Sequence, residues 1–245
     1  MGHPPNARPF IAHDPCNVTL RLLAPAGPVN SGRLATVHAR YRASPSSLST
    51  RWEWDDGAVE DAELEIGDAR TRRSHRYANP GVYRVTVRIG PRGDEPGQVR
   101  YVTVRTDVQA AASGWIRDAS SATPVPFGFL ITPAGEDRDG TILLRCALGV
   151  EEMRATELIW LFVTDPGSLH FGGIASIGSS DARHPFRVDA GSEVGGARHP
   201  TQRLTMSVYA AGAVPGHHSP LHRLSGQVRP GRIELGPLGE TPPKV

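Results

Sequence analysis

One stretch in the first half of the chain constrains the fold more than any other, because it contains two strands bounded by recognisable turns. Trp52 and Trp54 stand two positions apart, so on a strand both rings point to the same face and can bury a large apolar area. The run Asp55-Asp56-Gly57 ends that strand. Asn79-Pro80-Gly81 is a second turn signal, since proline presets one backbone angle and glycine accepts a positive one. Alternating residues from Tyr83 to Val87 then predict a half-buried strand, and the whole stretch predicts a β-sandwich.

The same residues resemble the motif of the PKD (polycystic kidney disease) domain, an immunoglobulin-like sandwich. That family carries Trp-Asp-Phe-Gly-Asp-Gly, then His-x-Tyr, Pro-Gly and Tyr-x-Val-Thr. The matching positions in this chain are Trp52, Trp54, Asp56, Gly57, His75, Tyr77, Pro80, Gly81, Tyr83, Val85 and Thr86. Asp55 departs from the pattern, because it stands where the family usually has a glycine. Aspartate tolerates a positive φ less well than glycine does, so this position bears on the geometry of the turn. The resemblance implies that the matching aromatic side chains and His75 hold a sandwich together rather than contact a ligand.

Length and composition predict an all-β protein of two domains. A chain of 245 residues can close two cores of ordinary size, and its 27 glycines and 22 prolines are scattered between short apolar runs. We expect an Ig-like (PKD) β-sandwich followed by a second antiparallel β-sandwich or open barrel. The expected parts are an N-terminal arm (1–14), the sandwich (15–106), a linker (107–113), the second β domain (114–236) and a Pro-rich tail (237–245). The linker is short, so it should restrict the relative orientation of the two domains.

The second half contains about eight strand-sized apolar runs. Gly114-Trp115-Ile116 and Phe127-Gly128-Phe129 begin the series and, with Arg154-Ala155-Thr156 and the run Arg232 to Leu235, resemble a β domain that follows PKD modules in bacterial surface proteins. The run Leu158 to Val163 has no polar alternation, which predicts a strand covered on both sides. We allow one short helix at residues 151–157.

Charge and hydropathy argue against two classes of partner. A net charge of +2 is too small for a protein that neutralises a phosphate backbone, so we expect no nucleic-acid partner. No run approaches the roughly 20 apolar residues of a membrane span, so we expect no membrane insertion. The family resemblance implies an extracellular, cell-surface or particle-surface protein, although the first residues do not have the pattern of a secretion signal.

The cysteines and the polar clusters offer few candidates for chemistry. Cys16 and Cys146 are the only cysteines, and we favour two separate buried thiols while leaving a bridge between the domains open. His217, His218 and His222 have a spacing at which imidazoles could share a metal ion, but no acidic residue lies nearby in sequence. Asp55 and Asp56 could offer oxygens to calcium, although we prefer Asp56 as a partner of its own turn. We therefore expect no metal, no cofactor and no catalytic residue.

These patterns together favour a non-catalytic interaction protein. We expect a spacer, adhesion or assembly module that presents β-sandwich surfaces to protein partners or to copies of itself. One alternative is a carbohydrate-binding accessory module that stacks a polysaccharide on Trp115, whereas Trp160 should be buried among its apolar neighbours. The other alternative is a metal-dependent enzyme built on the three clustered histidines.

Overall fold

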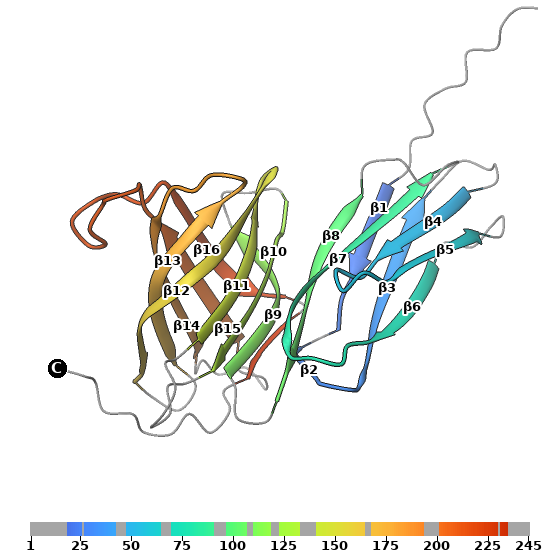
Figure 1. Ribbon diagram of the computed structural model, residues 1–245, viewed down its shortest axis with the longest axis horizontal. Coiled ribbons are helices and arrows are strands. Elements are labelled where there is room, and N and C mark those ends of the chain that lie inside the picture. The colour runs from blue at the N-terminus through green and yellow to red at the C-terminus, as the bar shows by residue number, and fades with distance from the viewer. Residues whose placement is uncertain are drawn as a thin grey trace, which may run out of the picture.

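The structure, a computed structural model, describes residues 19–25, 27–42, 48–64, 70–90, 97–106, 110–118, 123–132, 141–164, 168–193, 201–229 and 231–234. These residues form strands and turns and no helix, so the all-β prediction is confirmed. Strands β1 to β8 form one unit and strands β9 to β17 form a second unit beside it (Figure 1). None of the described residues belongs to a helix with the length and hydrophobicity needed to cross a membrane.

The first unit is a sandwich of two sheets. One sheet has the order β1-β3-β6 and contains β1 (Thr19–Leu23), β3 (Leu34–Arg42) and β6 (Arg70–Arg76). The other has the order β2-β8-β7-β4-β5 and contains β2 (Val29–Asn30), β8 (Gln98–Arg105), β7 (Gly81–Gly90), β4 (Leu48–Glu53) and β5 (Val59–Leu64). The strands within each sheet are antiparallel except for β2, which pairs parallel with β8.

Period-two alternation explains the core of the sandwich. Trp52 on β4 and Trp54 just beyond it are both fully buried, as their spacing requires, and Val85 and Val87 of the neighbouring strand β7 lie in the same core. The facing sheet contributes Leu22 of β1 together with the small side chains of β3. One continuous apolar layer therefore separates the two sheets.

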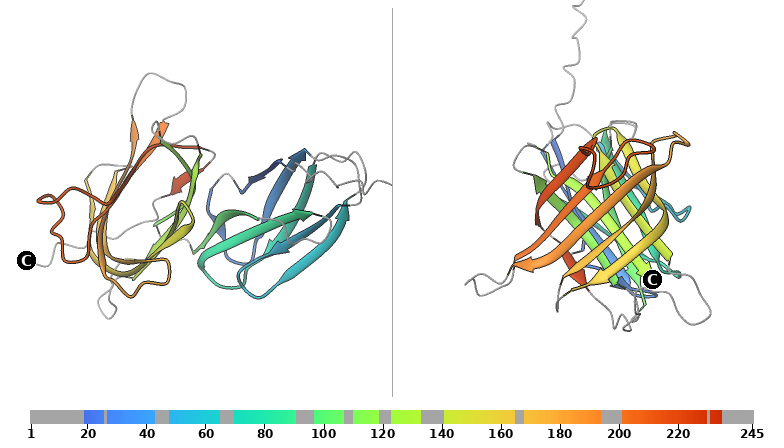
Figure 2. Two further views of the ribbon diagram at one scale, coloured as in Figure 1. Left: turned by 90° about the horizontal axis from the view of Figure 1, so that it is seen from above. Right: turned by 90° about the vertical axis from the view of Figure 1, so that its left-hand side faces the viewer.

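The second unit is a closed barrel. Its strands are β9 (Ala110–Asp118), β10 (Val125–Thr132), β11 (Thr141–Leu148), β12 (Glu151–Val163), β13 (Leu169–Ile177), β14 (His184–Glu193), β15 (Thr201–Val208), β16 (His222–Val228) and β17 (Arg232–Glu234). Each strand from β9 to β16 pairs antiparallel with the next, and β16 pairs with β9, so eight strands close a ring; β17 adds to β9 beside β16. Seen from above, the barrel and the sandwich stand next to each other with β9 and β10 between them (Figure 2, left). Of the two architectures that we considered for this half, the structure has the barrel, and it is closed.

The barrel interior is filled by side chains. Four phenylalanines, Phe127, Phe129, Phe171 and Phe186, are fully buried there and contact one another edge to face or tilted. Branched and sulfur-containing residues from the other strands complete the packing, including the buried free thiol of Cys146. Burial raises the pKa of that thiol, because the thiolate would have to form in an apolar core. Cys16, the other cysteine of the bridge that we left open, lies outside the described residues.

Strand β12 differs from two of our expectations. The short helix that we allowed at residues 151–157 is wrong, because these residues pair with β11 on one side and β13 on the other. The run that follows is not covered on both sides, since Ile159 is 60% exposed and Phe162 is 48% exposed. Two breaks in register with β13, at Ala155/Glu157 and Leu158/Trp160, shift the alternation and turn several apolar side chains outward.

The parts of the chain between and around the two units are only partly described. Strand β9 begins at Ala110, inside the segment 107–113 that we expected to be a linker, and residues 107–109 lie outside the described part. The expected arm (1–14) and tail (237–245) also lie outside the described residues.

Candidate functional site

The residues of the first motif lie in one row through the sandwich. The rings follow one another from Trp52 to Trp54 (5.9 Å between centroids), to His75 (5.0 Å), to Tyr77 (4.7 Å) and to Tyr83 (3.9 Å). The two tyrosines of the row are tied to the sandwich itself by hydrogen bonds. The Tyr77 hydroxyl donates to the Trp54 carbonyl at 3.2 Å and the Tyr83 hydroxyl donates to the Asn79 carbonyl at 2.8 Å. Burial raises the pKa of Tyr77, which keeps this hydroxyl a donor.

The turn after β4 holds the other motif residues. Gly57 has φ of 94°, and Asp55 has φ of 66° in the position where the PKD pattern has glycine. Asp56 accepts hydrogen bonds from the backbone N–H of Ala58 at 3.2 Å and from His75 at 2.6 Å. Partial burial opposes ionisation of Asp56, but the hydrogen bonds from His75 and from the Ala58 N–H, together with the attraction of His75, outweigh it and lower the pKa. Pro80 and Gly81 lead into β7, where Tyr83 packs against Gly81.

Asp55 holds a positive φ and uses its carboxylate to connect the two units. It accepts a hydrogen bond from the backbone N–H of Arg84 at 2.9 Å, and it forms an ion pair with Arg145 of the barrel strand β11. The left-handed conformation costs a non-glycine residue on the order of 1 kcal/mol. The departure from the family pattern thus coincides with a contact that a glycine could not make.

Arg145 is the centre of an ionic network at the joint between the units. Besides Asp55, it donates to Glu152 of β12 at 3.0 Å and to the carbonyl of Val82 in the sandwich at 3.1 Å. Tyr101 of β8 donates its hydroxyl to the same Glu152 carboxylate at 2.6 Å. The Arg145 and Glu152 side chains are only 15% and 13% exposed, so their charges are mostly shielded from water. Each charge is therefore stabilised mainly by the opposite charge of its partner.

The pKa shifts of this network follow from the pairing. Partial burial opposes ionisation of Glu152, but hydrogen bonds from Arg145 and Tyr101 outweigh it and lower the pKa of Glu152. Burial also opposes the charge on Arg145, but its bonds to Glu152 and Asp55 raise the pKa. Burial and the bond to Glu152 raise the pKa of Tyr101. The network therefore contains the carboxylates of Asp55 and Glu152, the guanidinium groups of Arg145 and Arg154, and the phenol of Tyr101.

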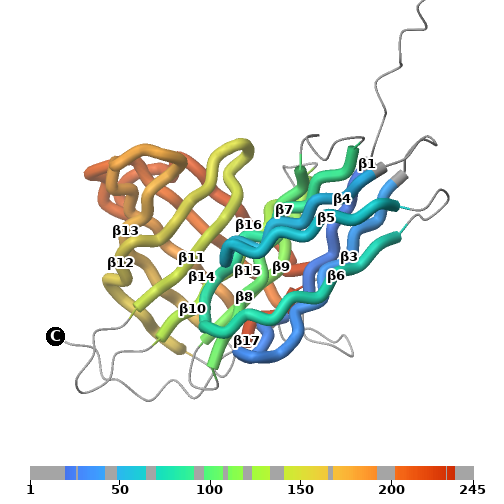
Figure 3. The backbone as a smooth tube through the Cα atoms, turned by 45° about the vertical axis from the view of Figure 1, so that its right-hand side comes forward, coloured from blue at the N-terminus to red at the C-terminus, as the bar shows by residue number. Residues whose placement is uncertain are grey.

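An apolar cluster lies beside the ionic network. It contains Val82 and Tyr101 of the sandwich and Ala111 and Leu130 of the barrel, all buried. Gly128 of β10 allows the sheets to approach, because a Cβ atom there would lie 2.8 Å from Val82 and 2.9 Å from the Thr103 hydroxyl. The same Thr103 hydroxyl donates to the backbone carbonyl of Ala112 at 2.6 Å. Strands β8, β9 and β10 run close together at this joint (Figure 3).

Trp115, our candidate for carbohydrate contact, lies in the joint. Its side chain is 4% exposed, and the guanidinium of Arg100 lies 4.0 Å from its ring centroid, with Arg21 at 5.6 Å. Burial and the neighbouring Arg21 lower the pKa of Arg100 to about 10. Arg105 makes a further connection to β17, an ion pair of 2.8 Å with Glu234. A ring covered in this way offers no free face to a sugar in this conformation.

The structure does not bring the histidine candidates together as a metal site. His217 and His218 lie in the loop after β15, where the Nδ1 atom of His218 contacts the backbone of Val214, and His222 begins β16. Asp55 and Asp56 are occupied by the contacts described above. Within the described residues, no three His, Cys, Asp or Glu side chains converge as a metal ion would require.

Sequence reasoning missed the outer face of β12 to β14. This face is turned away from the sandwich (Figure 2, right). Trp160, which we expected to be buried, lies there half-buried, with its ring centroid 5.5 Å from that of Phe162. The register breaks in β12 move these side chains outward. No local residue pattern in this segment predicts a β-bulge.

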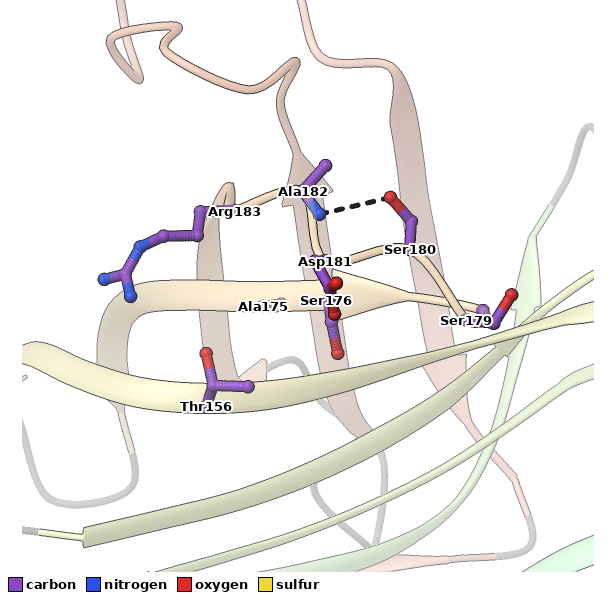
Figure 4. Close-up of a pocket in the computed structure, with 9 residues that line it drawn as sticks. Thr156, Ala175, Ser176, Ser179, Ser180, Asp181, Ala182 and Arg183 are labelled. Atoms are coloured by element: carbon purple, nitrogen blue, oxygen red, sulfur yellow. Dashed lines mark hydrogen bonds between the residues drawn. The ribbon is translucent and has the colours of Figure 1, made fainter.

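A shallow polar hollow of about 470 Å³ lies on the same side of the barrel, at the connection between β13 and β14. Its lining includes Thr156, Ser176, Ser179, Asp181 and Arg183 (Figure 4). The Ser180 hydroxyl accepts a hydrogen bond from the backbone N–H of Ala182 at 3.1 Å and shapes this turn. Ser176 is one of several hydroxyl-bearing side chains that line this hollow.

Comparison with known proteins gives one similarity. The chain is 38% identical to polycystin-1 of Homo sapiens over 73 residues, which is 29% of this chain and 2% of polycystin-1. No protein-family model matches the chain, and no solved structure matches it. The similarity is consistent with a PKD-like β domain in this chain.

Proposed function

We propose that this chain is a non-catalytic interaction protein, a spacer, adhesion or assembly module whose first unit is a PKD domain. The observation that carries this proposal is the joint. Tandem domains usually move relative to one another unless their interface is extensive and apolar. Here an apolar cluster, a shielded ionic network centred on Arg145 and the Arg100–Trp115 contact all connect the same two units.

A fixed joint determines the direction in which the two units present their surfaces. Such a fixed direction is useful to a protein that holds partners, or copies of itself, at a set distance, whereas an enzyme would require a concave site with convergent polar groups. The similarity of part of the chain to polycystin-1 supports the PKD assignment within this proposal. A location outside the cell, on its surface or on a particle is part of the same proposal.

Distance measurement between spin labels tests the fixed joint. Labels at Arg72→Cys on β6 and Arg223→Cys on β16, both exposed, would report the separation of the units in a Cys16→Ser background with the buried Cys146 retained. We expect one narrow distance distribution. Gly128→Val should broaden or shift it, because its side chain would collide with Val82 and Thr103, at a cost of about 1–3 kcal/mol.

Gly191→Val is the matched control for that variant. Gly191 also lies in a barrel strand, but its nearest neighbour is the Ser168 hydroxyl and not the sandwich. We expect the control to keep the narrow distribution. A broad distribution in the unmodified chain would contradict the proposal that the joint is rigid.

A further inference from the structure

The outer face of the barrel carries two aromatic side chains in adjacent rows. In the register of β12 and β13, Trp160 lies opposite Gly172, and Phe162 lies opposite His170. The Trp160 ring rests directly against the glycine, because a Cβ atom there would be 2.6 Å from the ring. The two rings are tilted by 31°, and Phe162 is 48% exposed. They form a short apolar platform on the barrel surface, in which Phe162 is exposed and Trp160 is partly buried.

Polar side chains beside this platform are held in place by one another. The Nδ1 atom of His170 lies 2.7 Å from Asp189, and its Nε2 atom lies 3.2 Å from the Thr164 hydroxyl. Arg187 donates to both oxygens of Asp189 at 2.9 Å. Partial burial opposes ionisation of Asp189, but the bonds from Arg187 and His170 outweigh it and lower the pKa of Asp189. These donors and acceptors are therefore ordered before any ligand arrives.

The two carboxylates beside the aromatic platform are compensated locally. Asp189 is paired with Arg187, and Glu157 of β12 is paired with Arg183 at 2.5 Å. A face without excess charge gives no electrostatic preference to an anion or a cation. It favours a neutral ligand that offers apolar patches and hydroxyl groups together.

The polar hollow extends this face along β12. Thr156, which lines the hollow, precedes Phe162 by six residues, a distance of roughly 20 Å along a strand. Between them lie Trp160 and the Glu157–Arg183 pair. The strip formed by Thr156, Glu157, Trp160, Phe162, His170 and Arg183 is thus long enough for several sugar units.

We propose that this outer strip of the barrel binds a neutral oligosaccharide, with the Trp160 and Phe162 rings contacting the apolar faces of its sugars and the paired polar side chains bonding their hydroxyls. Aromatic rings supply broad contact area at low cost in conformational entropy. Few but preordered polar groups supply orientation. This binding does not depend on the rigidity of the joint, since the strip faces away from it.

A protein partner is the competing occupant. Ile159 and Val163, 60% and 48% exposed, lie on the same strand and would suit a protein contact. The preordered His170–Asp189–Arg187 group favours a polyhydroxylated ligand, because fully paired charges still offer hydrogen bonds without demanding a counter-charge.

Titration of the full chain with neutral hexasaccharides tests this proposal. The probes are cellohexaose, xylohexaose, laminarihexaose and chitohexaose, measured by isothermal titration calorimetry. We expect binding of at least one probe with a Kd below about 1 mM, and a loss of about tenfold or more in Phe162→Ser and in His170→Ala. Val59→Ser removes an aliphatic side chain that is also 48% exposed, but on the sandwich, and should leave the affinity unchanged.

Three results would overturn it. One is the absence of binding of all four probes to the folded chain at millimolar concentration. Another is equal affinity in Phe162→Ser and the unmodified chain. The third is self-association in sedimentation that Phe162→Ser abolishes, with no saccharide bound, which would identify the strip as a protein contact. Circular dichroism of each variant shows whether it is folded before it is titrated.

Discussion

The sandwich and the barrel use their tryptophans in opposite ways. In the sandwich, Trp52 and Trp54 follow strict alternation and are fully buried, each stacked on the next ring in the row. In the barrel, phenylalanines fill the interior, while Trp115 is buried in the joint and Trp160 lies on the outer face. Spacing along a strand thus assigns two side chains to the same face, but the contacts of that face decide whether it is core, joint or surface.

Truncation of one tryptophan in each unit should give the largest difference in stability between a core and a surface position. Trp52→Ala should reduce the free energy of unfolding by about 3–5 kcal/mol, because it leaves a large cavity among buried residues of the sandwich. Trp160→Ala should cost less than about 2 kcal/mol, since its ring is only partly buried and lies on the outer face. Urea denaturation followed by circular dichroism compares the two. Equal losses would contradict the assignment of Trp52 to the core and Trp160 to the surface.

The ionic network predicts a dependence of stability on pH that neither core should show. The pKa of Glu152 is lowered in the fold, so between its unfolded value near 4.5 and its folded value the unfolded state binds more protons. The stabilisation is therefore fully present above about pH 4.5 and is lost as the pH falls through the folded pKa. We expect Glu152→Gln to lower the free energy of unfolding at pH 7 by about 1–3 kcal/mol. On acidification, this variant should lose less stability than the unmodified chain does.

Thermal unfolding at several pH values between 7 and 3 checks this prediction. Glu63→Gln, an exposed residue of β5, is the matched control and should follow the unmodified chain. If Glu152→Gln and Glu63→Gln gave the same pH profile, the Arg145–Glu152 pair would not contribute to the stability of the joint.

The smallest expected effect on stability belongs to Asp55. Asp55→Gly should relieve about 1 kcal/mol of backbone strain and remove the ion pair with Arg145, so the net change should lie within about 1 kcal/mol. The spin-label distance should nevertheless broaden, because one connection of the joint is lost. Asparagine at this position can adopt the same φ but carries no charge, so Asp55→Asn should broaden the spin-label distance distribution equally. An unchanged distance in both variants would show that the ion pair does not orient the units.

The fold was largely predictable because its signals are local. Alternation, paired turn residues and the glycine at φ of 94° after β4 all act within a few positions, and they predicted the strands around Trp52 and Tyr83. The error at residues 151–157 has a tertiary cause, since pairing with β11 and β13 overrode a helical propensity that the segment carries by itself. The second error was to expect residues 158–163 to be covered on both sides. Bulges in β12 caused it, because they change which side chains face outward and cannot be recognised from the composition of the segment.

The candidate sites were predictable only in part. The resemblance to the PKD motif drew attention to Asp55 as a departure, but the partner of Asp55 lies 90 residues away along the chain. Trp115 was a candidate for sugar contact only under one alternative, and two arginines of the other unit cover it. Trp160 and Phe162 were expected inside and lie outside. Each difference concerns contacts between segments that are distant in sequence.

By itself, the sequence determined that the chain is all-β, where most strands lie and which aromatic side chains of the first half share a face, because strand periodicity and turn chemistry depend on neighbouring residues. Tertiary structure alone decided that the second half closes into a barrel, that Gly128 and Arg145 meet the sandwich, and that Trp160 reaches the surface. Those outcomes depend on which sheets pack together and on the register between strands. Sheet packing and register are set by the sum of many weak contacts between residues distant in sequence, and a short motif contains no information about them.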